Sequence, residues 1–322
     1  MVSVRLPRFT RAKQITPPQL TARDREIIRR VFEHRFLRST QIHALIGGSR
    51  QQLLRRLQRL YHHGYLERPR AQIDYYHQGG SQSMVYGLGH TGAALLKREL
   101  NLPFHRLDWS AKNQEVKRLF LEHALLTADV MVAFELACRR HGGVRLISAD
   151  ELSLPDETRQ KREPFRWPVI AKHQLKLGVQ PDRVFALEFS DRSRAFFFLE
   201  ADRATMPVMR PNFEQSSFYR KLLAYEATWT QNLHRSRFGF HRFRVLTVTT
   251  SAERVKHLIE ASRQLERGHG LFLFTDVASL VAHGDILTLP WQMCQPGKTE
   301  TLTSSPLRCA MVVPLARKFV LC

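Results

Sequence analysis

Hydrophobic residues in the first hundred positions recur every three or four residues in three stretches, which predicts three helices. These patterns run over residues 22–35, 40–46 and 50–63. Two short apolar runs then flank a polar segment rich in Gly, Ser and Gln, which is typical of a β-hairpin. A further helix is expected over residues 91–100.

Residues that favour helix ends bracket these patterns. Thr21, with Asp24 three positions later, resembles a capping box with Asp in the place of Glu. Gly47-Gly48 ends the second helix, Ser49 starts the third, and Gly64 stops it. Three helices followed by a hairpin describe a winged helix-turn-helix, in which the third helix enters the DNA major groove.

From residue 113 to residue 250 the pattern predicts the order helix, strand, strand, strand, helix, strand. These elements are a helix over 113–141, a strand over 144–150, a hairpin over 179–202, a helix over 213–234 and a strand over 243–250. A helix to about residue 267 and the strand LFLFTD follow. The segments 153–177 and 203–212 are interpreted as loops, and residues 282–322 have no assignment.

The same order is the core order of the restriction-endonuclease-like fold. The predicted class is therefore α+β/α/β: an N-terminal winged helix-turn-helix followed by a mixed-sheet restriction-endonuclease-like α/β domain. We expect a basic N-terminal arm over 1–18, the winged helix-turn-helix over 19–105, the nuclease-like domain over 106–290, and a tail of unknown role over 291–322.

Charge narrows the class of partner. The net charge is +21 and the pI about 10.6, and residues 1–70 hold 16 Lys and Arg against four Asp and Glu. A soluble protein this basic usually binds a polyanion. No apolar run approaches the ~20 residues of a spanning helix, the N-terminus lacks a secretory core segment, and the four cysteines form no C-x-x-C motif. We expect a cytoplasmic protein without a membrane partner, whose basic arm either contacts phosphates or is disordered.

The third predicted helix has two distinct faces. Its apolar set is Leu53, Leu54, Leu57, Leu60 and Tyr61, and its opposite face carries Gln52, Arg55, Arg56, Arg59, His62 and His63. Arg and Gln make bidentate contacts to guanine and adenine, respectively. We therefore predict DNA binding by Gln52, Arg55, Arg56, Arg59 and His63. A solvated surface and a protein-binding winged helix stay open as alternatives.

Residues 87–92 read G-x-G-x-x-G, a pattern also found in dinucleotide-binding folds. Those folds place the motif in a β-α-β unit with an acid about 20 residues later. Here the motif ends a hairpin, and no parallel strand follows promptly. We interpret the glycines as shaping the turn into a packing helix.

Acids lie at both ends of the predicted hairpin over 179–202. Asp182 follows Pro181 at the first strand, and Glu200 and Asp202 end the second. In restriction-endonuclease-like proteins such acids bind Mg²⁺, which generates the attacking hydroxide. The catalytic candidates are therefore Asp182, Glu200, Asp202 and Lys221, with Asp182 and Glu200 as ligands of Mg²⁺.

Asp202 occupies the position where that fold carries a lysine, and some branches carry the lysine on the following helix, where Lys221 lies. Asp202 either adds a metal ligand or marks a descendant that only binds DNA. Solvated strand ends are the plainest alternative. No G-x-S-x-G elbow and no P-loop occur. A metal-dependent DNA endonuclease and a protein without catalysis both stay open.

The chain resembles the replication-relaxation family. The blocks "LTARDREIIRRVFEHRFLRSTQIHALIG", "RRLQRLYHHGYLERP" and "VYGLGHTGAALL" look like its start. The blocks "FLEHALLTADV", "QPDRVFAL", "FFLEADRAT", "KLLAY" and "VLTVTT" resemble its later parts in order, so that the match spans roughly residues 19–276. The resemblance implies a protein of plasmids and other mobile elements that acts in DNA replication, relaxation or transfer. It implies no particular reaction.

The expected partner is double-stranded DNA, with other mobile-element proteins as further partners and a homodimer as the default assembly on DNA. One alternative is a non-catalytic transcription or copy-number regulator, which a palindromic footprint without metal dependence favours. The other is a recruitment or assembly factor for a relaxase, integrase or replication initiator, which co-purification of such a partner favours.

Overall fold

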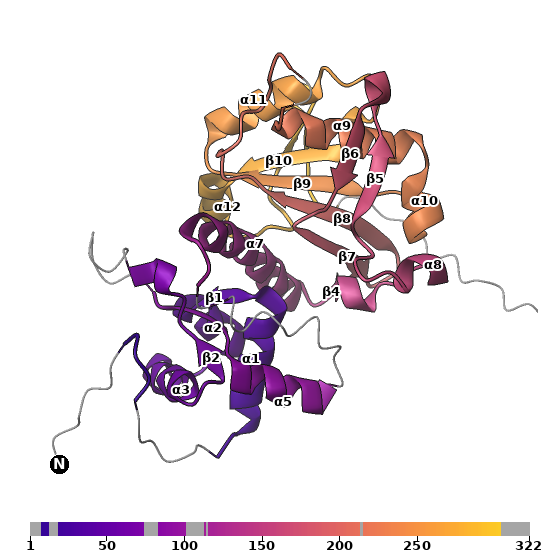
Figure 1. Ribbon diagram of the computed structural model, residues 1–322. Helices are drawn as coiled ribbons and strands as arrows, with labels where there is room; N and C mark the ends of the chain where they lie inside the picture. Colours follow the sequence, from indigo (N-terminus) through magenta and orange to yellow (C-terminus); the bar gives the residue numbers. More distant parts are fainter. Residues whose placement is uncertain are drawn as a thin grey trace, which may run out of the picture. The chain divides into compact units, whose positions relative to one another are not determined.

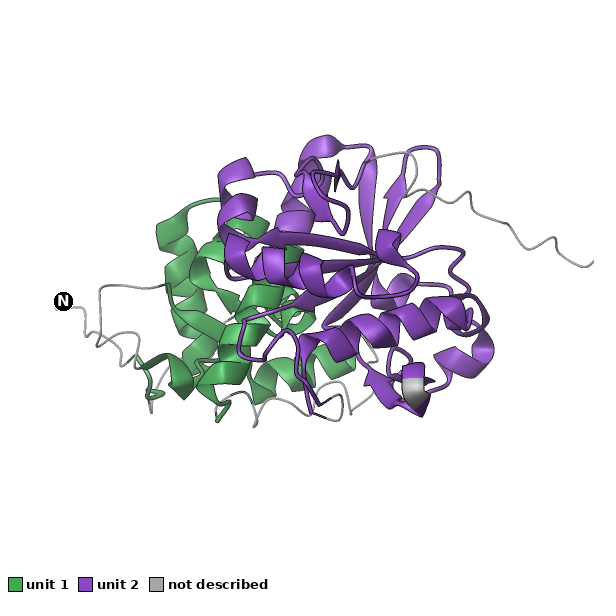
Figure 2. Cartoon of the chain, turned by 90° about the horizontal axis from the view of Figure 1, so that it is seen from above, with its two compact units in different colours: residues 1–132 green, residues 133–322 purple. Residues whose placement is uncertain are grey.

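The computed structural model describes residues 8–12, 19–73, 83–100, 113, 115–212 and 215–303. The chain divides into two compact units, residues 1–132 and 133–322 (Figure 2). The division falls within helix α7 (Arg118–His141), whereas the boundary expected at residues 105–106 lies outside the described residues. Among the described residues, no helix combines the length and apolar character needed to cross a bilayer.

The first unit consists of short helices and a small sheet (Figure 1). Its elements before α7 are α1 (Ala22–His34), β1 (Phe36–Arg38), α2 (Ser39–Ile46), α3 (Arg50–His62), β2 (Leu66–Glu67), η1 (Arg70–Gln72), β3 (Val85–Leu88) and α5 (His90–Leu100). The sheet is antiparallel in the order β1-β3-β2. The start of α7 packs Leu121 and Leu125 against Phe36 and Val85 of this sheet.

The predicted helix ends of this unit are confirmed. Thr21 and Asp24 form a reciprocal capping box at α1, and Ser49 caps α3 by accepting from the backbone N–H of Gln52. Gly47 follows α2 at φ 74°, a conformation that favours glycine. Strand β1 was not predicted: its three residues are too few for a period of two to emerge from the sequence.

The glycines of the G-x-G-x-x-G stretch lie against backbone. A Cβ atom at Gly89 would come within 2.2 Å of the carbonyl oxygen of Gly64, and one at Gly92 within 2.3 Å of that of Tyr65. The start of α5 therefore packs on the turn after α3 at a distance that only glycine permits. This contact is consistent with the packing interpretation of the motif.

The second unit is built around one large sheet (Figure 1). Its elements after α7 are β4 (Val144–Ser148), η3 (Ala149–Glu151), α8 (Asp156–Arg159), β5 (Trp167–Ile170), η4 (Lys172–Gln174), β6 (Lys176–Val179), β7 (Arg183–Phe189), β8 (Arg194–Ala201), α9 (Phe218–Thr230), α10 (Leu233–Phe238), β9 (Arg244–Thr249), α11 (Ala252–Ser262), η5 (His269–Leu271), β10 (Phe272–Asp276), α12 (Val277–His283), β11 (Trp291–Met293) and β12 (Thr299–Glu300). The seven-stranded sheet has the order β12-β11-β10-β9-β8-β7-β4, and β5 pairs with β6 separately.

The centre of this sheet is parallel, and the pairs on both sides of it are antiparallel. The pairs β4–β7 and β7–β8 are antiparallel, as the predicted hairpin requires, whereas β8, β9 and β10 are parallel. Helices α9 and α10 connect β8 to β9, and α11 connects β9 to β10. Parallel neighbours need such helical crossovers. The predicted order from residue 113 to residue 250 holds for the main sheet, but the chain inserts α8 and the β5–β6 hairpin between β4 and β7.

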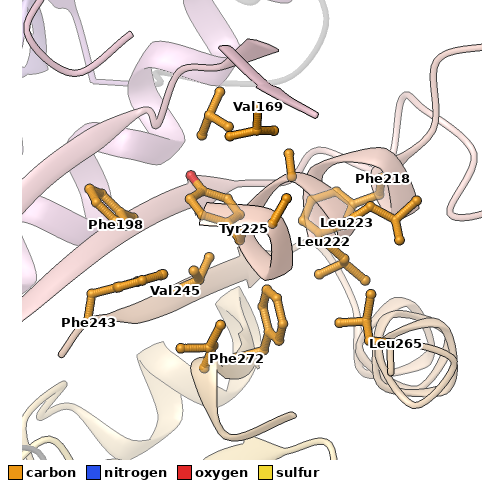
Figure 3. Close-up of a cluster of buried hydrophobic side chains, with 14 of the residues drawn as sticks. Val169, Phe198, Phe218, Leu222, Leu223, Tyr225, Phe243, Val245, Leu265 and Phe272 are labelled. Atoms are coloured by element: carbon orange, nitrogen blue, oxygen red, sulfur yellow. The ribbon is translucent and has the colours of Figure 1, made fainter. Parts of the chain in front are cut away.

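The core of the second unit lies between the sheet and its crossover helices. Figure 3 shows Phe198, Val245 and Phe272 of β8, β9 and β10 beside Leu222 and Tyr225 of α9. The β5–β6 hairpin also covers α9, because its Trp167 is buried and donates from Nε1 to the hydroxyl of Thr228 over 3.0 Å. At ~25 cal/mol per Å², burial of these aromatic side chains is a large stabilising term.

Three predictions for this unit were wrong. Residues 153–177 are not one loop, because they contain α8 and most of the β5–β6 hairpin. The helix expected over 213–234 begins at Phe218 and is interrupted at Asn232, which adopts φ 55° before α10. Residues 291–300, expected in a tail of unknown role, supply strands β11 and β12 of the main sheet.

Candidate functional site

Helix α3 presents an exposed face with positive charge that no acid among the described residues pairs with. Gln52, Arg55 and Arg59 are exposed, and their spacing of three and four residues places them on one side of the helix. Leu53 and Leu57 on the other side are fully buried. Helix α3 contains no acid, and no ion-pair partner of Arg55 or Arg59 lies in the part of the chain that the structure describes.

On helix α1, in the same unit, arginines form ion pairs with acids. Arg30 lies 2.7 Å from Glu26 and 3.1 Å from Glu33, and Arg29 pairs with the same two acids. Arg25 reaches Glu99 of α5 over 2.9 Å. Arg25, Arg29 and Arg30 of α1 are therefore paired with acids, whereas Arg55 and Arg59 of α3 have no such partner among the described residues.

Arg56 of α3 stabilises the fold through hydrogen bonds to the start of α1. Its Nη1 donates to both carboxylate oxygens of Asp24, each over 2.7 Å, and to Thr21 Oγ1 over 3.0 Å. Burial raises the pKa of Asp24, but the hydrogen bonds from Arg56 and Thr21 outweigh it and hold the pKa below the ordinary value. The guanidinium thus ties α3 to the capped start of α1, which the sequence did not indicate.

The two histidines at the end of α3 lie in different environments. His62, expected on the polar face, is buried, and its Nδ1 accepts from the backbone N–H of Ala12 over 3.2 Å. His63 is half-buried, and burial followed by the nearby Arg59 lowers its pKa. Leu54, expected in the apolar set, is 39% exposed. The placement of His62 and Leu54 on the helix was therefore predicted wrongly.

Residues 8–12 of the predicted arm are held against the base of the hairpin. Arg11 donates to Glu67 over 2.7 Å and to the carbonyl of Tyr61 over 3.1 Å. Arg68 donates to the carbonyl of Arg8, and its guanidinium lies 4.1 Å from the ring centroid of Tyr61. This part of the arm serves the fold, and residues 1–7 and 13–18 lie outside the described residues.

The second unit brings three of the predicted catalytic residues together at one edge of its sheet. Asp182 precedes β7, Glu200 lies near the end of β8, and Lys221 lies in the first turn of α9. Lys221 Nζ is 2.5 Å from Glu200 Oε2, and the hydroxyl of Tyr225, one turn later, donates to Glu200 Oε1 over 2.6 Å. Asp182 Oδ2 accepts from the backbone N–H of Ala201 over 2.8 Å.

Burial dominates the electrostatics of this carboxylate cluster, which we define as Asp182, Glu200, Lys221 and Tyr225. Glu200 is 2% exposed, and burial raises its pKa against the opposing effect of Lys221. Burial and Glu200 together raise the pKa of Tyr225. Burial lowers the pKa of Lys221, but Glu200 and Asp182 outweigh it, so the pKa is raised and the ammonium persists.

The side chain of Asp202 forms hydrogen bonds with Arg254 and not with Lys221. Its Oδ2 accepts from Arg254 Nε over 2.8 Å and from the Thr249 hydroxyl over 2.8 Å, and its Oδ1 accepts from Arg254 Nη2 over 3.2 Å. Arg254 also donates to the carbonyl of Met206 over 2.7 Å, which fixes the loop after β8. A bidentate, buried arginine pair is a structural use of a carboxylate. No sequence signal links Asp202 to Arg254, because they are 52 residues apart on different elements.

The donor set of the cluster fits a hard divalent cation. Asp182 and Glu200 supply carboxylate oxygens, and each such oxygen has two lone pairs. Mg²⁺ usually takes one or two carboxylates and completes its shell with phosphate and water. Among the described residues, no group of three or more His, Cys, Asp or Glu is arranged to hold a metal ion. Any metal there would depend on two protein ligands.

The described residues form two compact units with mixed α/β structure, with an exposed cationic helix face in the first and a buried glutamate paired with Lys221 in the second. Comparison with protein families matches residues 28–241 to the replication-relaxation family. The chain belongs to this family, which supports a role in mobile-element DNA processing. No curated protein and no solved structure matches the chain.

Proposed function

We propose that this chain is a cytoplasmic DNA-binding protein of a mobile element, and that its first unit is a winged helix-turn-helix whose recognition helix is α3. The observation that carries the proposal is the row of exposed side chains Gln52, Arg55 and Arg59, whose two arginines pair with no acid in the described part of the chain. Arginines of this kind gain affinity for DNA by releasing counterions from phosphates and by bidentate contacts to guanine.

Two further features support a helix-turn-helix. Gly47 and Gly48, both at φ 74°, join α2 to α3, and Arg23 of α1 donates to the carbonyl of Gly47. Strands β2 and β3 pair antiparallel, as the two strands of a wing do. The tip between them, residues 74–82, lies outside the described residues.

Binding of a fluorescent duplex, measured by anisotropy over a series of salt concentrations, tests this function. Arg55→Ala and Arg59→Ala should each weaken binding and reduce the slope of log affinity against log salt by about 1 if the side chain contacts a phosphate. Arg29→Ala is the matched control, since Arg29 is compensated by Glu26 and Glu33. Equal affinities for all three variants and the unaltered chain would remove α3 from the interface.

We further propose that the second unit has a restriction-endonuclease-like architecture and nicks DNA with Mg²⁺ held by Asp182 and Glu200. The element order from α7 to β9, and the gathering of Asp182, Glu200 and Lys221 at one sheet edge, favour this candidate. When bound, the metal would activate water and stabilise charge on phosphate. Lys221 would keep one positive charge beside the carboxylates, and Tyr225 would orient Glu200.

Incubation of the full chain with supercoiled plasmid and Mg²⁺, Mn²⁺ or EDTA tests the second unit. We expect nicked plasmid only with metal, and none with Asp182→Ala, whereas Asp156→Ala, at an exposed acid of α8, should nick normally. A plasmid that stays intact but shifts in a gel would assign the cluster to stability. The chain would then be a DNA-binding regulator or recruitment factor.

A further inference from the structure

Leu54 lies at the border between the buried and the exposed faces of α3. It is 39% exposed, whereas Leu53, Leu57 and Leu60 of the same helix are 1% exposed or less. Its neighbours three and four positions away on the helix are Arg50, Gln51 and Gln58, together with the buried Leu57. Leu54 is thus an exposed apolar side chain bordered on its solvent side by groups that donate hydrogen bonds.

The position of Leu54 along α3 matters for what it can contact. It is the fifth residue of the helix, one position before Arg55. In helix-turn-helix proteins the N-terminal residues of the recognition helix contact base edges, while the rest of the interface positions the protein through phosphates. A side chain at this place therefore reaches bases before it reaches the backbone.

The DNA major groove offers an apolar side chain one group in particular. Guanine, adenine and cytosine present hydrogen-bond donors and acceptors there, whereas thymine adds its C5-methyl group. Leu54 cannot accept or donate a hydrogen bond, so burial against this methyl is its favourable contact with a base. Gln and Arg side chains beside it suit adenine and guanine, respectively.

We infer that Leu54 is a specificity-determining residue that reads a thymine methyl group in the major groove, beside the guanine read by Arg55. This inference rests on the proposed DNA-binding function and narrows its ligand. The ligand is duplex DNA whose site contains an A·T pair next to the base pair that Arg55 contacts. Uracil-containing duplexes bind more weakly, because they lack the methyl group.

The test begins with selection of preferred sites from a random-sequence duplex pool by the full chain. The selected duplex is then synthesised with thymine or with deoxyuracil at each A·T position, and its affinity is measured by anisotropy. We expect the unaltered chain to bind one thymine duplex about fourfold more tightly than its deoxyuracil counterpart, the equivalent of one buried methyl group. Leu54→Ala should bind both duplexes equally.

Leu119→Ala is the control, because Leu119 is also an exposed leucine, at 64%, but lies on α7. It should keep the preference for thymine. The inference is overturned if the unaltered chain shows no such preference, if Leu54→Ala retains it, or if the selected site has no A·T pair. A pool from which no duplex is selected would overturn the proposed function itself, whereas selection without a thymine preference overturns the role of Leu54 alone.

Discussion

Arg55 and Arg59 on α3 lie in solvent with no acidic partner among the residues that the structure describes, whereas Glu200 and Asp202 in the second unit are buried against Lys221 and Arg254. A charge in solvent costs the fold little, so it can be kept for a partner outside the chain. A buried charge is costly unless it is paired, so its partners are fixed inside the chain. Substitutions should therefore affect binding at the first region and stability at the second.

The largest effect is expected for Glu200→Ala. It leaves the buried Tyr225 hydroxyl without its acceptor and the partly exposed Lys221 ammonium without its partner, and an unsatisfied buried donor of this kind costs about 2–3 kcal/mol of unfolding free energy. Urea denaturation measures this loss. Glu260→Ala, at an exposed acid of α11, should change stability by less than about 0.5 kcal/mol. Similar values for both variants would contradict the contrast between the regions.

The next largest effect is expected in the pH dependence of stability, through Asp24. Because the pKa of Asp24 is held below its ordinary value of 3.8, Asp24 stabilises the fold above that pH, and this stability is lost as pH falls through the folded pKa. Asp24→Asn should lower the unfolding free energy by about 1–2 kcal/mol near neutral pH and flatten its decline below about pH 4. Chemical denaturation at several pH values measures both. An unchanged acid decline in the variant would show that other carboxyls control it.

Substitutions of two adjacent arginines of α3 should affect different properties: that of Arg56 the stability, and that of Arg55 the binding of DNA. Arg56→Ala removes the donor to Asp24 and should cost about 1–2 kcal/mol of unfolding free energy. Arg55→Ala should cost less than about 0.5 kcal/mol and act on DNA affinity alone. Denaturation and DNA-binding anisotropy of the two variants, measured side by side, show whether each residue acts on stability or on binding. The reverse order of stabilities would mean that the ion pair of Arg56 contributes little.

The smallest effect is expected for His63→Ala. Burial and Arg59 lower the pKa of His63, so the ring is neutral near pH 7 and releases no counterion from DNA. The salt dependence of binding at pH 7 should stay as it is in the unaltered chain. A slope reduced by about 1 would instead indicate a charged contact between His63 and phosphate.

Local signals made much of the fold predictable. Thr21 and Asp24 form the capping box that their spacing indicates, and β7 and β8 form the predicted hairpin, with Arg192 at φ 62° in its turn. The gathering of Asp182, Glu200 and Lys221 could be predicted because each follows from its place in the element order. These features depend on residues close in sequence or on adjacent elements.

Other features depend on contacts that no local pattern encodes. Strand β5 contains Pro168, which argues against a strand unless it lies at an edge, and β5 pairs only with β6 in a two-stranded sheet. His62 is buried because residue 12 covers it, 50 positions away. The pairing of Arg56 with Asp24, and of Arg254 with Asp202, likewise appears only once distant elements meet.

The close approach of Gly89 and Gly92 to the carbonyls of Gly64 and Tyr65 also constrains how this chain can evolve. Every missense change of a glycine codon introduces a Cβ atom, so no single-base route leads away from either position without displacing backbone. A lineage would keep these glycines for steric reasons alone. Their conservation in homologues would look like that of a nucleotide-binding loop, although the selection would be for the close packing of α5 on the turn after α3.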